Sequence, residues 1–199
     1  MIALVHYGAG NIRSVAKALE AVGATVHVTG DYRDLRNASK IVLPGVGAFG
    51  RTVESLSAGS LMEPLIEELL SGKPFLGICL GGQVLFESSE ENPGATGLGI
   101  LKGRVLRLPE KLKVPHLGWN RVSQTPGLAV WKGIPDGSFF YFAHSYIFMP
   151  EDASCTAGRT EYGRSFVSAV CRDAVWGLQF HPEKSQKWGL KILENFVRQ

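Results

Sequence analysis

The chain has 199 residues, of which 45% are hydrophobic and 20% are charged, and its formal net charge at pH 7 is +3. These values are typical of a single globular domain over residues 1–199 and exclude a disordered chain. Because no run of Lys or Arg is present and no apolar stretch reaches the length of a membrane span, neither nucleic acid nor a membrane is an expected partner.

Three cysteines, Cys79, Cys155 and Cys171, give an odd count without paired spacing. This usage suits a reducing compartment, with one thiol for chemistry and two for packing. Residues 1–6 also lack the charged start of a signal peptide. We therefore expect a cytoplasmic protein.

The first half of the chain alternates apolar runs with amphipathic segments. Residues 2–7 have the apolar character of a central parallel strand, and the helix that follows is expected to use Asn11 as its N-cap. Further strands are expected over residues 24–28 and 40–43, and another helix over residues 61–70. This alternation predicts a doubly wound α/β sheet that binds ligands at the C-terminal ends of its strands.

Two glycine-rich turns follow expected strands. The first contains Gly8 and Gly10, but Arg13 occupies the third glycine position of a dinucleotide fingerprint, and no P-loop ending is present. The second, residues 44–50, reads Pro-Gly-Val-Gly-Ala-Phe-Gly and leaves backbone N–H groups free to face an anion. These glycines suit either a simple tight turn or a loop that faces an anion, and no nucleotide cofactor is predicted.

The most informative stretch is residues 74–83, where an apolar run leads into a sharp turn and then a segment expected to be helical over residues 83–87. This order is typical of a nucleophile elbow with Cys79 in the place of serine. Gly77 and Gly81 allow the flanking backbone to pass without a Cβ, and a helix N-terminus favours thiolate over thiol. A lone cysteine would be interpreted as a packing residue, but this order of elements favours a nucleophile.

After residue 87 the pattern changes to aromatic and β-branched runs separated by short turns. Residues 98–108, 139–142 and 165–172 are expected to form antiparallel or mixed strands. Residues 174–180 are a further expected strand, and a final helix is expected from about residue 185. The predicted fold is α/β, with a doubly wound, mostly parallel central sheet flanked by helices and an appended antiparallel or mixed region.

A thiol nucleophile that attacks an amide needs a base and then an acid for the departing nitrogen. His6 and His27 lie inside expected strands and are interpreted as core or rim residues. His116 and His144 lie in segments expected to be irregular, where they are available to ligand or solvent.

His181 differs from the other histidines because of the two residues that follow it. Pro182 favours an extended conformation for His181, and residues two apart in extended chain point to the same side. Glu183 is therefore expected beside His181, where a carboxylate fixes the imidazole tautomer as in a catalytic triad. The alternative is an ordinary surface turn, but the position of His181 at a strand end, where the elbow also opens, favours a catalytic role.

These motifs resemble the class I (triad) glutamine amidotransferases, through the elbow Gly-Ile-Cys-Leu-Gly-Gly-Gln and the sequence His-Pro-Glu. Within that class the chain most resembles the family of glutaminase subunits of imidazole glycerol phosphate synthase. The blocks behind the narrower resemblance are residues 7–11, 44–49, 115–120 and 181–185. Many amidotransferases have Gly-Gly where this chain has Gly45-Val46, and this departure agrees with the narrower family.

The resemblance implies that glutamine is the substrate, with Cys79 as nucleophile, His181 as base and acid, and Glu183 as the orienting carboxylate. It implies an oxyanion hole formed by the N–H of Leu80 and by the loop at Val46 and Gly47. The positions implied to hold the glutamine head are Gly45, Gly47, Gln83, Ser145 and Tyr146.

The resemblance also implies a heterodimer with a (βα)8-barrel cyclase in histidine biosynthesis. The cyclase of the family combines the ammonia with a phosphoribulosyl-formimino aminoimidazole carboxamide ribonucleotide, and its products are imidazole glycerol phosphate and an aminoimidazole carboxamide ribonucleotide. No metal or organic cofactor is implied. The positions implied to contact the partner are Gly10, Asn11, Trp119, Asn120, Tyr141 and Lys184.

Three alternatives stay open at this point. The nearest is an amidotransferase subunit that serves a different synthase. A cysteine peptidase or esterase on a similar fold is the second, and turnover of glutamine against peptides or esters distinguishes it. A binding module without activity is the third, but such a module has no use for Cys79, His181 and Glu183 together.

Overall fold

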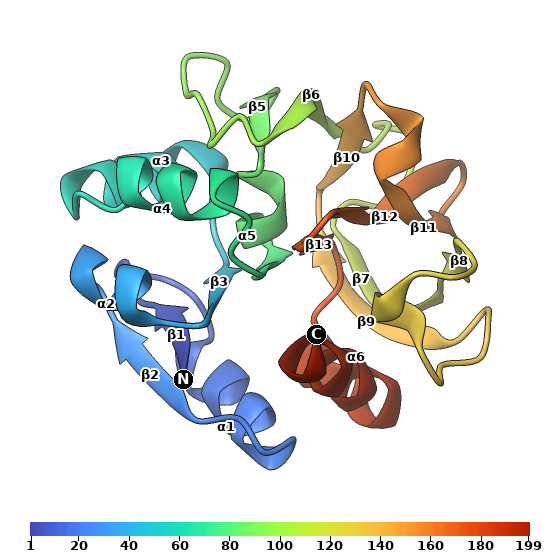
Figure 1. Cartoon of the computed structure of the whole chain (residues 1–199). Helices are drawn as coiled ribbons and strands as arrows, with labels where there is room; N and C mark the ends of the chain where they lie inside the picture. The colour runs from blue at the N-terminus through green and yellow to red at the C-terminus, as the bar shows by residue number, and fades with distance from the viewer.

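A mixed sheet forms the centre of the molecule, and the computed structural model describes all of residues 1–199. Its strands are β1 (Ile2–Val5), β2 (Val26–Thr29), β3 (Lys40–Gly45), β4 (Phe75–Cys79), β5 (Phe86–Ser89), β6 (Leu101–Arg107), β8 (Ser123–Gln124), β10 (Tyr146–Pro150), β11 (Thr156–Glu161), β12 (Ser165–Arg172) and β13 (Val175–Leu178). They follow the order β2-β1-β3-β4-β13-β12-β10-β6-β5, and off this path β11 pairs with β12 and β8 pairs with β11 (Figure 1). Strands β7 (His116–Arg121) and β9 (Phe139–His144) form a separate antiparallel pair.

The half of the sheet that contains the elbow is parallel. Strand β1 pairs in parallel with β2 and β3, and β4 pairs in parallel with β3 and β13. Antiparallel pairing begins at β12 and continues through β10 to β6. The predicted fold class, a mostly parallel sheet with an appended antiparallel or mixed region, is confirmed.

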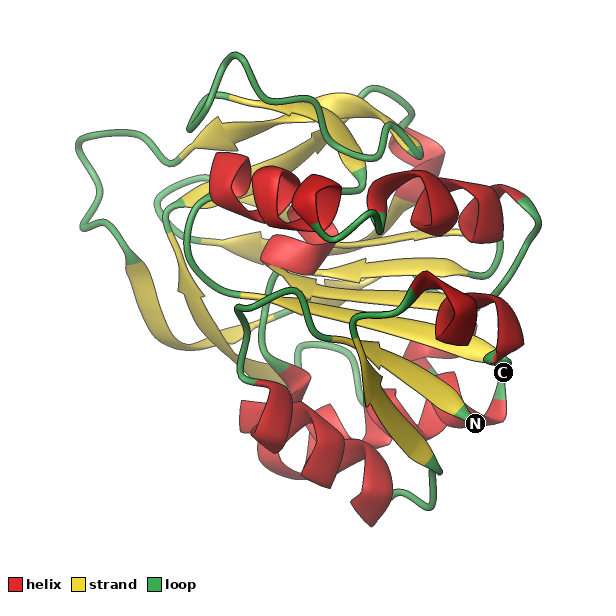
Figure 2. Ribbon diagram, turned by 90° about the vertical axis from the view of Figure 1, so that its left-hand side faces the viewer, coloured by secondary structure: helices red, strands yellow, loops and turns green.

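Helices cover both faces of the parallel half (Figure 2). They are α1 (Ile12–Ala21), α2 (Tyr32–Asn37), α3 (Phe49–Ala58), α4 (Met62–Leu70), α5 (Leu80–Gln83) and α6 (Gln186–Arg198). Because side chains alternate along a strand, Ala3 and Val5 pack with α2, α3 and α4, whereas Ile2 and Leu4 pack with α1 and α6. No helix combines the length and apolar character that a membrane-spanning segment requires.

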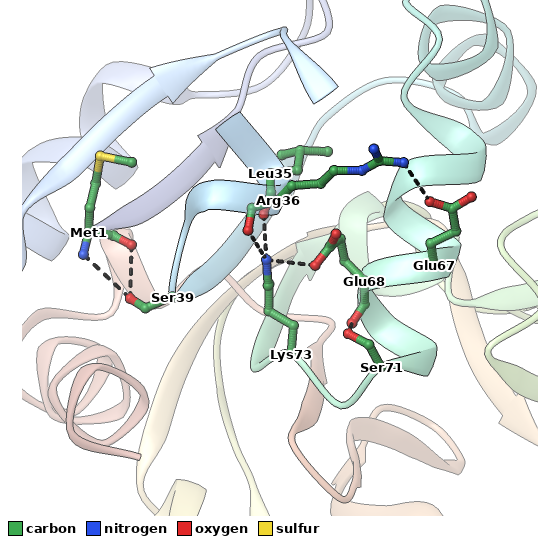
Figure 3. A network of polar contacts seen from close by, with 8 residues as sticks. All are labelled: Met1, Leu35, Arg36, Ser39, Glu67, Glu68, Ser71 and Lys73. Carbon is green, nitrogen blue, oxygen red and sulfur yellow. Dashed lines mark hydrogen bonds and ion pairs between the residues drawn. The ribbon is translucent and has the colours of Figure 1, made fainter. Parts of the chain in front are cut away.

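A polar network fixes the helices at the edge where β4 begins (Figure 3). The Nζ of Lys73 donates to the carbonyl oxygens of Leu35 (2.7 Å) and Arg36 (2.8 Å) near the end of α2, and it forms an ion pair with Glu68 of α4 at 2.6 Å. The Lys73 ammonium thus satisfies carbonyl groups that the C-terminus of α2 leaves free. The chain therefore enters β4 with both neighbouring helices held in place.

Several element predictions were wrong in position or type. Residues 83–87 were expected to be helical, but α5 ends at Gln83 and β5 begins at Phe86. The reason is tertiary pairing, since Leu101 N donates to Leu85 O at 2.9 Å and β5 pairs with β6. Helices α2 and α3 were not predicted. Asn11 precedes α1, but its side chain makes no capping hydrogen bond.

Candidate active site

Cys79 ends strand β4 in a backbone conformation that residues other than glycine rarely adopt. Its φ is 53° and its ψ is −108°, and α5 begins at the next residue. A Cβ on Gly81 would lie 1.8 Å from the carbonyl oxygen of Leu43, and one on Gly77 would lie 2.4 Å from that of Gly81. This sharp, strained turn between strand and helix is the geometry of a nucleophile elbow.

The pairing of β4 with β13 brings Cys79 and His181 to the same edge of the sheet. The two strands are parallel, with Ile78 opposite Leu178, so both chains leave the sheet at their C-terminal ends. His181 lies three residues after Leu178 and, like Cys79, lines the same cavity. The edge at which ligands were predicted to bind therefore holds both side chains.

Glu183 forms a buried ion pair with His181. Nδ1 of His181 lies 3.0 Å from Oε1 of Glu183, and the two side chains are 3% and 1% exposed. His181 is extended (φ −101°, ψ 98°), and Glu183 reaches it from a 3-10 turn, η3 (Pro182–Lys184), rather than from extended chain. The His181 backbone N donates to Tyr141 O at 2.9 Å, and its carbonyl accepts from Ser185 Oγ at 2.6 Å. The imidazole is thus fixed from several directions.

Electrostatics favour the protonated form of His181. Burial alone would lower the pKa of its imidazole, but hydrogen bonding and charge interaction with Cys79 and Glu183 outweigh burial and raise the pKa to about 9. A cationic imidazole beside a sulfur stabilises a thiolate. The arrangement can therefore hold a nucleophile and a proton donor in one site.

A cavity of about 290 Å³ opens in front of Cys79. It is lined by Val46, Gly47, Cys79, Leu80, Gln83, Glu91, Pro115, Ala143, His144, Ser145, Tyr146, His181 and Lys184. The structure thus brings together all but two of the residues predicted for catalysis, the oxyanion hole and the glutamine head. Glu183 lies behind His181. Gly45 was expected to contact the substrate but packs under the elbow, where a Cβ would lie 2.7 Å from Gly81 N.

The loop after β3 lines this cavity and has backbone N–H groups without a partner. The N–H groups of Val46 and Gly47 have no hydrogen-bond partner in the protein, whereas those of the next two helical residues are occupied. Phe49 N donates to Glu91 Oε2 at 2.7 Å, and Gly50 N donates to Asn92 Oδ1 at 2.9 Å. These side chains cap the N-terminus of α3 and hold the end of the loop, leaving its first N–H groups available.

A second polar group lies beneath the cavity. Gln83 Nε2 donates to Tyr146 O at 3.3 Å and to Gln179 Oε1 at 3.2 Å. Gln179 Nε2 in turn donates to the Sγ of Cys79 at 3.7 Å. Both amide side chains are buried, so this is an internal network that reaches the sulfur.

His116 and His144 do not lie in irregular segments, contrary to the sequence prediction. They lie on β7 and β9, directly opposite one another, and both are buried. The His144 ring contacts Tyr146 O through Nδ1 (2.8 Å) and His116 Nδ1 through Nε2 (2.9 Å). Burial lowers the pKa of His144 to about 3 and that of His116 to about 4. With both ring nitrogens of His144 occupied, His181 is the better candidate base.

The two remaining histidines are exposed rather than buried in the core. His6 follows β1, and His27 on the outer strand β2 lies 3.1 Å from Asp34. The interpretation as rim residues suits them, and the interpretation as core residues was wrong. Neither lines the cavity.

Some of the predicted partner residues form an exposed cluster beside the cavity. Trp119 lies opposite Tyr141 in the β7–β9 pair, with ring centroids 6.0 Å apart, and is 46% exposed. Lys184 Nζ lies 5.7 Å from the centre of the Tyr141 ring. Asn120 instead donates to Glu161 O (2.9 Å), and Gly10 packs against Pro44 near the end of β3. The first three residues thus define one surface, which we call the aromatic rim (Trp119, Tyr141 and Lys184).

Glu91 and Gln179 belong to the site but were not predicted. Glu91 follows β5 in a loop without a recognisable motif, and only the fold places it at the cavity. Gln179 was within reach of the sequence, because it lies two residues before His181 in a segment expected to be extended. The same alternation that connected Glu183 to His181 also indicates Gln179.

Comparison with known proteins identifies the family. The model of the family described as glutamine amidotransferase class-I matches residues 3–199. The chain belongs to the class-I glutamine amidotransferases. Curated relatives of this amidotransferase carry a narrower name, "Imidazole glycerol phosphate synthase subunit HisH". One from Syntrophotalea carbinolica is 49% identical over 203 residues, which cover 98% of this chain and 98% of the relative. One from Aquifex aeolicus is 51% identical over 196 residues, which cover 98% of this chain and 95% of the relative. The amidotransferase is therefore also a member of the HisH family.

Solved structures agree on the fold. A structure titled "Crystal structure of glutamine amidotransferase" superposes with a TM-score of 0.78 at 18% identity, covering 98% of this amidotransferase and 99% of that chain. "Structure of PurLQS from Thermotoga maritima" gives a TM-score of 0.75 at 20% identity, covering 99% and 97%. At these identities the likeness concerns the fold alone.

Proposed function

We propose that this amidotransferase hydrolyses glutamine to glutamate and ammonia, using Cys79 as nucleophile, His181 as acid and base, and Glu183 as the orienting carboxylate. The observation that carries the proposal is the convergence of a strained cysteine elbow and a buried His–Glu pair on one cavity. The cavity volume, about 290 Å³, is at the small end of ligand sites and suits an amino acid better than a polypeptide. This size disfavours a peptidase.

The reaction follows from the placement of these groups. The Cys79 thiolate attacks the side-chain carboxamide carbon of glutamine, and the carbonyl oxygen becomes an oxyanion. His181, held through Nδ1 by Glu183, donates its Nε2 proton to the departing nitrogen, so ammonia leaves and a thioester remains. His181 Nε2 then takes a proton from water, which attacks the thioester, releases glutamate and restores the thiolate.

The cavity provides partners for the charges of the substrate. We assign the oxyanion to the N–H groups of Leu80 and of the Val46–Gly47 loop, the latter having no partner in the protein. The glutamine head is assigned to Gly47, Gln83, Ser145 and Tyr146, as in the family it resembles. Glu91 adds a carboxylate to the same cavity and suits the α-ammonium group.

We further propose that the ammonia is delivered to a (βα)8-barrel cyclase in a heterodimer, for the synthesis of imidazole glycerol phosphate. Support comes from the name that the HisH relatives carry and from the aromatic rim beside the cavity. Aromatic side chains such as those of Trp119 and Tyr141 are enriched at protein interfaces. Gly10, Asn11 and Asn120 lie outside the aromatic rim, and they are assigned to the partner surface by the resemblance alone.

The test is a glutaminase assay of the purified chain with and without a candidate cyclase, with Cys79→Ala as the control for background. Glutamate production that depends on Cys79 and rises with the cyclase and its ligand supports the proposal. Turnover of peptides or esters in place of glutamine would contradict it. Stimulation by another amidotransferase-dependent synthase, and not by the cyclase, would favour the alternative of a subunit that serves a different synthase.

A further inference from the structure

We propose that Gln179 is a positioning residue for the nucleophile, whose side-chain amide holds a hydrogen-bond donor on the Cys79 sulfur and stabilises the thiolate. The inference rests on the proposed role of Cys79 and concerns a residue outside the triad. Gln179 Nε2 lies 3.7 Å from Sγ, within the range of a donor to sulfur. The amide stabilises a thiolate only if its nitrogen, rather than its oxygen, faces the sulfur.

The orientation of the amide is fixed by a chain of contacts that starts at a backbone carbonyl. Tyr146 O can only accept, so the end of Gln83 that lies 3.3 Å from it must be the nitrogen. The same nitrogen of Gln83 lies 3.2 Å from Gln179, which must present its oxygen there. The NH₂ of Gln179 is therefore left to face Sγ, and a flipped amide would place two donors against each other.

The side chain of Gln179 does not contact solvent. Its side chain is fully buried, and its backbone N donates to Ser168 O at 2.9 Å, which holds the residue where β13 ends. A buried amide is costly unless its donors and acceptors are satisfied, so a polar side chain here needs partners. The partners it has are Gln83 and the cysteine sulfur.

The contact has a defined chemical consequence. When Cys79 is a thiol, the contact is a weak neutral one, whereas a thiolate accepts a stronger, charge-assisted bond. Gln179 therefore shifts the equilibrium toward thiolate, in addition to the effect of His181, and opposes the contact of the thiol with Ala143 O (4.0 Å), which favours the thiol. The other titratable side chains that face Cys79 are Tyr7 and, on the cavity, Glu91, His144, Tyr146 and Lys184. A stabilised thiolate is also less nucleophilic, since intrinsic reactivity falls as basicity falls. Loss of the donor should therefore lower the fraction of thiolate at a given pH and raise the nucleophilicity of each thiolate.

The test is the pH dependence of Cys79 alkylation by iodoacetamide in the full chain without glutamine, followed by peptide mass spectrometry. Burial raises the pKa of Cys155 and also raises that of Cys171, to about 11, so these thiols react slowly at neutral pH. In Gln179→Met the midpoint of the profile should move up by about one pH unit, which is a tenfold change in the thiolate equilibrium. The rate at the alkaline plateau should rise roughly threefold.

Asn195→Leu is the matched control, because Asn195 is also a buried amide but donates to Val130 O (3.0 Å) and Lys132 O (2.9 Å), away from the cavity. It should leave the midpoint unchanged. If Gln179→Met does not fold, Gln179→Glu keeps the acceptor for Gln83 and removes the amide donor, and its midpoint should rise at least as far.

A folded Gln179 variant with the midpoint and plateau of wild type would overturn the inference. Alkylation is measured without glutamine, so it remains informative even if the wild-type chain shows no glutaminase activity. Failure of the proposed function and failure of the role of Gln179 are therefore separate results.

Discussion

Replacing Glu183 by Gln tests the electrostatics of the site most directly. The substitution keeps the shape of the side chain but removes the charge that lies 3.0 Å from Nδ1 of His181. A hydrogen bond to a charged group contributes about 1.5–3 kcal/mol, which corresponds to about one to two pH units. We therefore expect the pKa of His181 to fall from about 9 to roughly 7–8, because burial, which lowers it, is then opposed chiefly by Cys79.

The measurement is an NMR titration of the histidine ring protons in wild type and in Glu183→Gln. His181→Ala identifies the His181 signal by its absence. The glutaminase kcat of Glu183→Gln, measured with the cyclase present, should fall on the order of 10³–10⁴-fold, since an amide can also stabilise the wrong tautomer. His181→Ala should lose more, because it removes the proton transfer itself. An unchanged His181 titration in Glu183→Gln would refute the reasoning.

The same pair also gives the sign of a pH effect on stability. Since the pKa of His181 is raised from 6.5 in the unfolded chain to about 9, its protonation stabilises the fold fully below pH 6.5. This contribution is lost as the pH rises through about 9. The loss of stability in Glu183→Gln, about 1.5–3 kcal/mol by urea unfolding, should be largest near pH 6 and shrink above pH 9.

Substitutions at three positions test other parts of the site. Cys79→Ala and Cys79→Ser should abolish glutamine hydrolysis with little change in thermal unfolding, and an electrophilic glutamine analogue should label Cys79 and neither Cys155 nor Cys171 by mass spectrometry. Gly81→Ala should lower Tm by about 10 °C or more in circular dichroism, because its Cβ would meet Leu43 O; a wild-type Tm would contradict the elbow geometry. Val46→Gly should raise glutaminase activity without the cyclase at least several-fold and weaken the stimulation by the cyclase. The reason is that glycine turns its N–H toward the site more easily than valine, and a missing oxyanion donor lowers the rate about 10²–10³-fold. We expect the chain to be nearly inactive without the cyclase, because its oxyanion hole is then incomplete. A wild-type chain that is fully active alone would refute this expectation.

The elbow could be predicted because its determinants are local. Gly77, Cys79 and Gly81 are close in sequence, and the clashes that demand glycine occur within the turn or against the adjacent strand. The ion pair of His181 and Glu183 is local for the same reason, although the conformation that joins them is a 3-10 turn. Patterns of a few residues therefore indicated both halves of the triad.

Helix α3 shows why other elements could not be predicted. Its first residue follows Ala48, which offers no side-chain cap, and its segment is rich in small and polar residues. The caps come from Glu91 and Asn92, which are more than 40 positions away in the chain. Tertiary contacts thus supply what a helix start signal normally supplies locally.

The two halves of the site are held by different means. The Cys79 half is fixed by steric contacts within the parallel core, where Gly81 lies against Leu43. The His181 half is attached by hydrogen bonds to β9, since His181 N donates to Tyr141 O (2.9 Å) and Tyr141 N donates to Ser185 Oγ (3.0 Å). Tyr141 is part of the aromatic rim. The aromatic rim therefore includes a residue that supports the histidine, whereas the contact of β9 with the cysteine is a weak one, from Sγ of Cys79 to Ala143 O at 4.0 Å.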